Sequence, residues 1–442
     1  MSRQNKENPD KMPRVGPDDA AHPQGDPAAA AAARPGARDR AARQAANRAA
    51  REARRAAARA ERAARRQDAS RDAPPASAEP VGPPGNRPAD PAPPARSAPA
   101  FATGPEPIPL PAPSHSVRFN ILIVAQRGRL ARQAALLAAS LRDSAPGWQG
   151  RLIVAEPRPE GAWAGSDTLI EPPARALLAD LGAEITPFTA RVFGRAYPYG
   201  NKIEALSLLP AAEPFLFLDS DTLITGPLDR VPFDFARPSA SMRRSASWPE
   251  PPLYGPGYGA IWKSLHDRFG LDFAASLDLS QPDEHWERYL YFNAGWFFGP
   301  DPQPFAQRFL DWAQAVRDDP GDALACQSLD PWLDQVVLPL VIHALGGGRP
   351  GPGLGGLDGD MTCHYRNFAL LYAREPEPAI DLAERLLAGP ALAALFAENE
   401  SARTLILEGE GRRRLFPMRA QTRTMPERTL RHLLRQQGLW PG

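Results

Sequence analysis

The chain has 442 residues with 52 basic and 51 acidic side chains, a formal net charge of +1. The first aromatic residue is Phe101, and residues 1–100 contain only four large aliphatic side chains, which are Met1, Met12, Val15 and Val81. So few apolar groups cannot offset the conformational entropy of the chain, which excludes a globular core in this first quarter. Only two cysteines occur, which excludes a disulfide scaffold and is typical of the cytoplasm.

Residues 1–115 are predicted to be a disordered Ala/Arg/Pro-rich tail and linker. Within them, residues 34–72 alternate Ala with Arg, two strong helix formers, so a solvated helix is expected there. Residues 1–100 carry 19 basic and 12 acidic side chains, a balance of +7. Such a tail could contact nucleic acid or anionic lipid, but its low complexity favours a segment without a specific nucleic-acid partner. No signal-like stretch and no run of 18 apolar residues occurs, so we expect a cytoplasmic chain.

Short apolar runs begin at residue 117 and alternate with helical stretches. The predicted strands are 119–125, 151–155, 183–187 and 214–225. One predicted helix ends near residue 142, and two more span 173–182 and 201–209. Short strands without polar alternation, separated by helices, indicate a parallel sheet covered on both faces. We therefore predict an α/β fold with a Rossmann-like first half, a later strand at 291–299, a helix over 330–345, and a basic, helical extension over 373–442.

The strongest chemical signal is the run Phe-Leu-Phe-Leu-Asp219-Ser-Asp221-Thr. Ligands of open parallel sheets bind beyond the carboxyl ends of the strands, and carboxylates at i and i+2 point to the same side. Because two close carboxylates repel, this pair indicates a divalent cation, and oxygen ligands favour Mg²⁺ or Mn²⁺. The alternative is that the acidic residues simply begin a turn.

Two further segments stand out. Lys202 and Lys263 are the only lysines after residue 100 in a chain that otherwise uses Arg. A compact point charge suits phosphate binding, although a surface helix would carry such a lysine equally well. Asn293 and Gly295 interrupt an aromatic strand, which would let the backbone approach a ligand closely, or mark an edge distortion.

The order of these motifs resembles the GT-A-fold glycosyltransferases, nearest the family-8 branch of glycogenin-like and bacterial lipopolysaccharide galactosyltransferase-like enzymes. The resemblance predicts a transferase domain over 116–372 and implies a nucleotide-diphosphate sugar donor. It implies an Mn²⁺ or Mg²⁺ ion held by Asp219, Asp221 and His364. The implied donor-binding residues are Gln126, Lys202, Asp219, Asn293, Ala294, Gly295 and Arg366, and the implied catalytic residues are Asp334 and Gln335.

The chain departs from the family pattern after His364, where Gly and then Lys-Pro-Trp are usual and this sequence reads Tyr-Arg366-Asn-Phe. Arg366 is therefore expected to replace the missing lysine. His343 competes with His364 as third metal ligand, but it lies in an apolar helical run where a core histidine is expected.

The implied reaction transfers a sugar to an acceptor hydroxyl of a glycan, lipid-linked glycan or protein, as in cell-surface glycan or lipopolysaccharide synthesis. Family 8 implies retention of anomeric configuration. The residues themselves leave inversion open, since Asp283, Glu284, Asp330 and Asp334 could each serve as a base.

Two other functions fit parts of the sequence. Haloacid-dehalogenase-like phosphohydrolases also carry an Asp-x-Asp-Thr run after an apolar strand, but there it normally opens the domain. A non-catalytic adaptor with a basic tail is the second alternative. The basic C-terminal stretch further suggests a peripheral contact with the inner face of the membrane.

Overall fold

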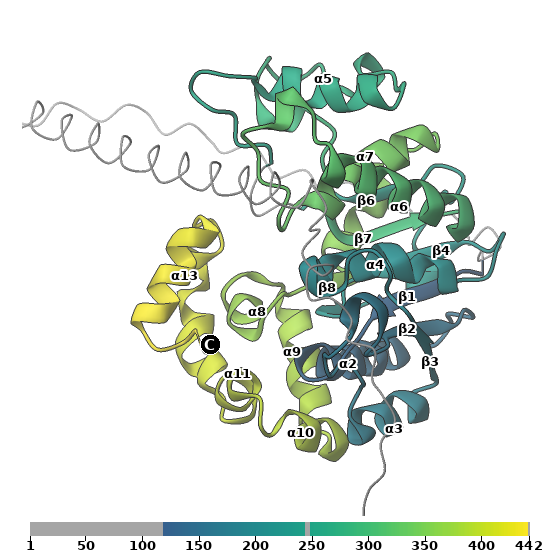
Figure 1. Ribbon diagram of the computed structural model, residues 1–442. Helices are drawn as coiled ribbons and strands as arrows, with labels where there is room; N and C mark the ends of the chain where they lie inside the picture. The colour runs from purple at the N-terminus through teal and green to yellow at the C-terminus, as the bar shows by residue number, and fades with distance from the viewer. Residues whose placement is uncertain (1–117, 244–247, 441–442) are drawn as a thin grey trace, which may run out of the picture. The chain divides into compact units, whose positions relative to one another are not determined.

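The computed structural model describes residues 118–243 and 248–440 (Figure 1). The predicted tail, including the helix at 34–72, lies outside the described residues. A six-stranded sheet runs in the order β3-β2-β1-β4-β7-β6. Its strands are β1 (Asn120–Val124), β2 (Leu152–Pro157), β3 (Ala183–Phe188), β4 (Phe215–Leu218), β6 (Ser239–Ser241) and β7 (Asn293–Gly299).

The first four strands along the chain pair in parallel, whereas β7 is antiparallel to both β4 and β6. Strands β1, β2 and β4 are almost wholly buried, because apolar runs without alternation can face two cores at once. This confirms the predicted α/β fold with a mostly parallel sheet.

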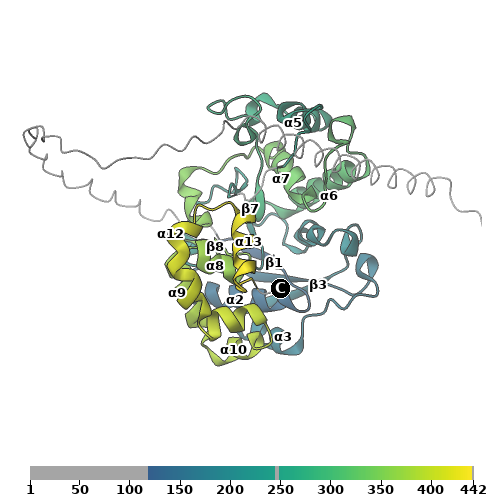
Figure 2. The same cartoon turned by 90° about the vertical axis from the view of Figure 1, so that its left-hand side faces the viewer.

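Helices cover both faces of the sheet (Figures 1 and 2). Successive residues of β1 divide between the two cores: Ile121 and Ile123 belong to one cluster and Leu122 to the other. The first face carries α2 (Arg129–Ser144), α3 (Pro172–Asp180) and the C-terminal helices. The second carries α4 (Asn201–Ala205), α5 (Tyr258–Arg268), α6 (Pro302–Asp318) and α7 (Leu333–Ala344).

The apolar run over 214–225 is not one strand. It leaves the main sheet after β4, turns through residues 219–221, and continues as β5 (Thr222–Ile224). β5 pairs antiparallel with β8 (Thr362–His364) in a separate two-stranded sheet, with Thr222 opposite His364. This pairing brings the end of β8 beside the turn that carries Asp219 and Asp221.

The predicted helical C-terminal segment is confirmed. It comprises α8 (Phe368–Arg374), α9 (Glu377–Leu387), α10 (Pro390–Phe396), α11 (Glu400–Ala402), two π-helical turns, α12 (Arg419–Thr422) and α13 (Glu427–Gln436). Their apolar side chains share one core with α2 and β1. The basic residue Arg412 contacts three acidic side chains of α9, so part of the C-terminal charge is balanced within the fold. Within the described ranges, no helix has the length and apolar character needed to cross a membrane.

Candidate active site

Two carboxylates and one imidazole meet where β4, β5 and β8 come together. His364 Nε2 lies 3.1 Å from Asp221 Oδ1 and 3.8 Å from Asp219 Oδ2. One ligand atom from each residue lies within 4.8 Å of the others. His343, the competing histidine, is in α7 and stacks edge-on against His266 with ring centroids 5.7 Å apart. The structure therefore brings His364, and not His343, to the aspartate pair.

The electrostatics of this cluster suit a cation. Burial alone would lower the pKa of His364, but the carboxylate of Asp221 raises it above its ordinary value. In return, although burial would raise the pKa of Asp221, the imidazole holds it below its ordinary range. One imidazole nitrogen and two carboxylate oxygens form a donor set that fits Mn²⁺, and Mg²⁺ with more water.

Lys202, on α4, is buried and not at the surface, which excludes the alternative of a solvated helix lysine. Its Nζ lies 2.9 Å from Asp219 Oδ1 and 3.3 Å from Asp334 Oδ2, and it donates to the Ala294 carbonyl at 3.1 Å. Burial alone would lower the pKa of this ammonium, but the two carboxylates raise it above its ordinary value. Lys202 therefore stays charged and fixes one oxygen of Asp219, which leaves the other facing His364.

Two tyrosines orient the predicted catalytic pair on α7. The Tyr197 hydroxyl donates to Asp334 Oδ1 at 2.7 Å and accepts from the Asp334 backbone N–H at 3.0 Å. The Tyr291 hydroxyl donates to Gln335 Oε1 at 3.0 Å. Sequence reasoning missed both tyrosines, because they lie 137 and 44 residues from their partners and form no local motif.

Of the four carboxylates considered as a base, Asp334 alone contacts Lys202 among the described residues. Glu284 accepts hydrogen bonds from the first backbone N–H groups of α5, at Tyr258 and Gly259, so it caps that helix. Asp283 is exposed and pairs with Arg288. Glu284 therefore stabilises the start of α5, whereas Asp334 lies in the candidate site.

Gly295 allows β7 to approach the cluster closely. Its carbonyl accepts from the Asp219 N–H at 2.8 Å, and its own N–H donates to Asn293 Oδ1 at 2.7 Å. A Cβ at this position would lie 2.3 Å from His364 Nδ1. The space that a side chain would take is therefore filled by the imidazole of His364.

Arg366 lies apart from this group of contacts. It has a φ of 61°, and its Nη1 lies 2.6 Å from Glu427 Oε2 of α13. The structure thus places Arg366 against the C-terminal helices.

A cavity of about 390 Å³ opens beside Lys202 and the two aspartates. Gln126 and Arg129, at the end of β1 and the start of α2, line its other side together with Tyr199. The Gln126 Oε1 atom is buried without a hydrogen-bond partner, and Arg129 Nη1 lies 4.0 Å from Asp221 Oδ2. The cavity is therefore lined by an unpaired hydrogen-bond acceptor, Gln126 Oε1, and by the positively charged side chain of Arg129.

Residues 121–346, just over half of the chain, match the model of the Rhodobacterales glycosyltransferase domain. The chain belongs to this glycosyltransferase family. This confirms the resemblance inferred from the motifs and favours sugar transfer over the phosphohydrolase alternative. No match was found among curated proteins.

Solved structures of glycosyltransferases are also similar to this chain. The galactosyltransferase LgtC, solved with donor and acceptor sugar analogs, is 15% identical, covers 64% of this chain and 99% of its own, and has a TM-score of 0.38. The glycosyltransferase GlyE of Streptococcus pneumoniae TIGR4 is 11% identical, covers 64% of each chain, and has a TM-score of 0.34.

Proposed function

We propose that this glycosyltransferase is metal-dependent and moves a hexose from a nucleotide-diphosphate donor to a hydroxyl of a glycan, lipid-linked glycan or protein acceptor. The observation that carries the proposal is the cluster of Asp219, Asp221 and His364 at the edge of a 390 Å³ cavity. Synthesis of a cell-surface glycan or lipopolysaccharide, in the cytoplasm or at the inner face of the membrane, is part of the same proposal.

The donor nucleotide would occupy the cavity. The buried Gln126 oxygen would accept a hydrogen bond from a base N–H, because an unpaired buried acceptor is costly when left empty. Tyr199, half exposed at the rim, offers a ring for stacking. Asp219, Asp221 and His364 would hold Mn²⁺ or Mg²⁺, which supplies charge neutralisation of the departing diphosphate. Arg129 would add positive charge on the same side.

The sugar would lie between β7 and the start of α7. There, Asn293, Ala294 and Gly295 would face one side of the ring, and Asp334 and Gln335 the other. Because Tyr291 donates to the Gln335 oxygen, the amide N–H₂ of Gln335 is the part left to donate to the sugar. Lys202 links both sides, since it contacts the Ala294 carbonyl and Asp334.

The surroundings of Asp334 support retention of anomeric configuration. A base in an inverting enzyme must reach the acceptor hydroxyl and take its proton. Asp334 is 1% exposed, one of its oxygens accepts from Tyr197, and the other faces Lys202. We therefore assign Asp334 a positioning role, with an oxocarbenium-like transition state at the sugar.

The test is hydrolysis of a panel of sugar nucleotides, which needs no acceptor. With Mn²⁺, the wild-type chain should release nucleoside diphosphate from one donor, and Asp221→Asn should lose this activity. Asp360→Asn is the matched control, because Asp360 is exposed and outside the cluster. If no donor is hydrolysed and no nucleotide binds with Mn²⁺, the proposal is wrong and the adaptor alternative gains support.

A further inference from the structure

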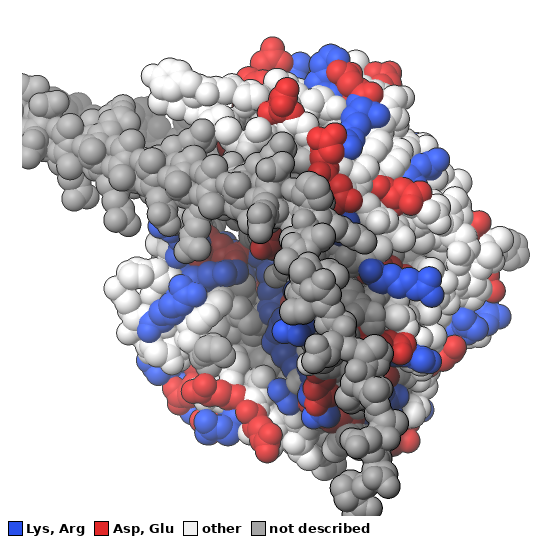
Figure 3. All heavy atoms as spheres, viewed as in Figure 1, with Lys and Arg blue, Asp and Glu red and all other residues white. Residues whose placement is uncertain are grey.

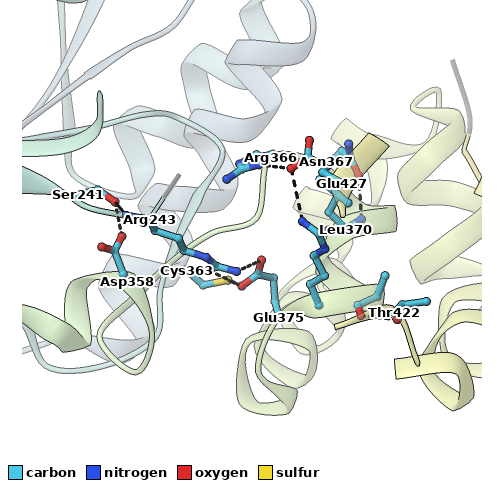
Figure 4. A network of polar contacts seen from close by, with 12 residues as sticks. Ser241, Arg243, Asp358, Cys363, Arg366, Asn367, Leu370, Glu375, Thr422 and Glu427 are labelled. Atoms are coloured by element: carbon cyan, nitrogen blue, oxygen red, sulfur yellow. Dashed lines mark hydrogen bonds and ion pairs between the residues drawn. The ribbon is translucent and has the colours of Figure 1, made fainter. Parts of the chain in front are cut away.

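Three guanidinium groups converge on one carboxylate behind the candidate active site. Arg366 Nη1 lies 2.6 Å from Glu427 Oε2, Arg374 Nη1 lies 3.5 Å from the same oxygen, and Arg431 contacts Oε1. These residues come from the segment after β8, from α8 and from α13, so the fold assembles them from distant parts of the chain. Figure 4 shows the Arg366–Glu427 pair of this group.

A second carboxylate continues the cluster. Arg243, after β6, makes a two-pronged contact with Glu375, with both N–O distances at 2.7 Å. Figure 4 shows Arg243 and Glu375 beside the Arg366–Glu427 pair. We call Arg243, Arg366, Arg374 and Arg431 the arginine cluster. Its four positive charges face Glu375 and Glu427, and Asp358 also interacts with Arg243, which leaves a surplus of one positive charge.

The surplus charge is presented outward. The Glu375 and Glu427 side chains are 5% and 9% exposed, whereas those of the four arginines range from 18% to 41%. Burial lowers the pKa of Arg374 below its ordinary value; Glu427 and Glu375 oppose this effect, whereas Arg366 and Arg243 add to it. Like charges held this close repel one another, so an added anion would be stabilised there.

The cluster lies next to the reacting centre but outside the nucleotide cavity. Arg366 follows His364 by two residues, while none of the four arginines lines the 390 Å³ cavity. Figure 3 shows Lys and Arg side chains gathered in the hollow between the C-terminal helices and the rest of the molecule. A hollow of this kind suits a small charged group on a substrate better than a flat lipid surface.

We infer that the arginine cluster binds a phosphate group carried by the acceptor, so that the acceptor of this transferase is an anionic glycan. The inference rests on the proposed function, since it assigns a substrate class to the same site. Guanidinium groups bind phosphate through paired, charge-assisted hydrogen bonds. A phosphate held by Arg374 and Arg431 would direct the neighbouring hydroxyl of the acceptor toward the sugar centre.

The first test compares transfer to paired acceptors, such as glucose with glucose 6-phosphate and galactose with galactose 6-phosphate, and glucuronic acid as a carboxylate. We expect kcat/KM to be at least tenfold higher for a phosphorylated sugar than for its neutral partner. Arg431→Gln should reduce this ratio severalfold, whereas Arg428→Gln, an exposed arginine on the same helix, should not. An equal rate for both partners, or a change only in the donor KM of Arg431→Gln, would overturn the inference.

A second test does not depend on enzyme activity. Binding of inorganic phosphate to the full chain is measured by calorimetry in EDTA, which removes the metal-dependent donor site. We expect wild type and Arg428→Gln to bind equally and Arg431→Gln to bind severalfold more weakly, with thermal unfolding used to check that each variant is folded.

Equal binding by all three would overturn the inference even if the chain hydrolyses a donor. Phosphate binding that depends on Arg431, in a chain without donor hydrolysis, would instead retain the anion site and reject the proposed function. Binding to vesicles of anionic lipid without binding to phosphate would overturn the inference and indicate that the arginine cluster contacts a membrane surface.

Discussion

Gly295 gives a sharp test of the candidate metal site, because the missing side chain makes room for a ligand residue. In Gly295→Ala the new Cβ would lie 2.3 Å from His364 Nδ1, whereas ordinary contact begins near 3.4 Å. The imidazole must therefore move by about 1.1 Å, the difference between these two values. Metal sites tolerate deviations of only about 0.2 Å in ligand distance.

We expect Gly295→Ala to bind Mn²⁺ about 10- to 100-fold more weakly than wild type, the range for changes that misplace a ligand. This corresponds to about 1.4 to 2.7 kcal/mol. The affinity is measured by calorimetry, together with the rate of donor hydrolysis.

Gly299→Ala is the matched control, because it makes the same substitution at the other end of β7. Its Cβ would meet only the rings of Phe215 and Phe305, at 3.1 to 3.2 Å. It should lose some thermal stability and keep wild-type Mn²⁺ affinity. Wild-type affinity in Gly295→Ala would show that His364 does not contribute to the site.

Three other outcomes follow from the described contacts. Removing metal with EDTA should abolish donor hydrolysis, and added Mn²⁺ should restore it; activity that persists in EDTA would contradict a metal-dependent reaction. Lys202→Met should unfold at lower denaturant concentration, with a loss of about 3 kcal/mol, because it leaves the buried Asp334 carboxylate without its cation. An exposed lysine offers the control, and Lys263→Met should change stability by less than about 1 kcal/mol. Burial holds the pKa of His266 below its ordinary value of about 6.5, so below that pH only the unfolded chain gains the proton. The unfolding midpoint should therefore fall as the pH drops from 6.5, and less steeply in His266→Phe; identical slopes would refute this assignment.

The sequence alone predicted the parallel strands of the sheet and the aspartate pair, because both depend on local patterns. Apolar runs without alternation can be buried on two faces, which predicts parallel strands such as β1 and β2. The position of Asp219 and Asp221 after such a strand predicts a site at its carboxyl end, and β4 carries them there. The motif order around these residues was sufficient to indicate the glycosyltransferase family that the domain match shows.

The tertiary structure decided which distant residues complete the site. The pairing of β5 with β8 brings His364 to the aspartates and leaves His343 against His266. The Tyr197 hydroxyl contacts Asp334 of α7 and the nearby Pro331, although at least 134 residues of the chain separate it from either partner. Arg366, which the resemblance implied as a donor-binding residue, forms an ion pair with Glu427 of α13. Such partners are separated by long stretches of chain, so their proximity is set by the packing of the C-terminal helices and strands, which no local sequence pattern encodes.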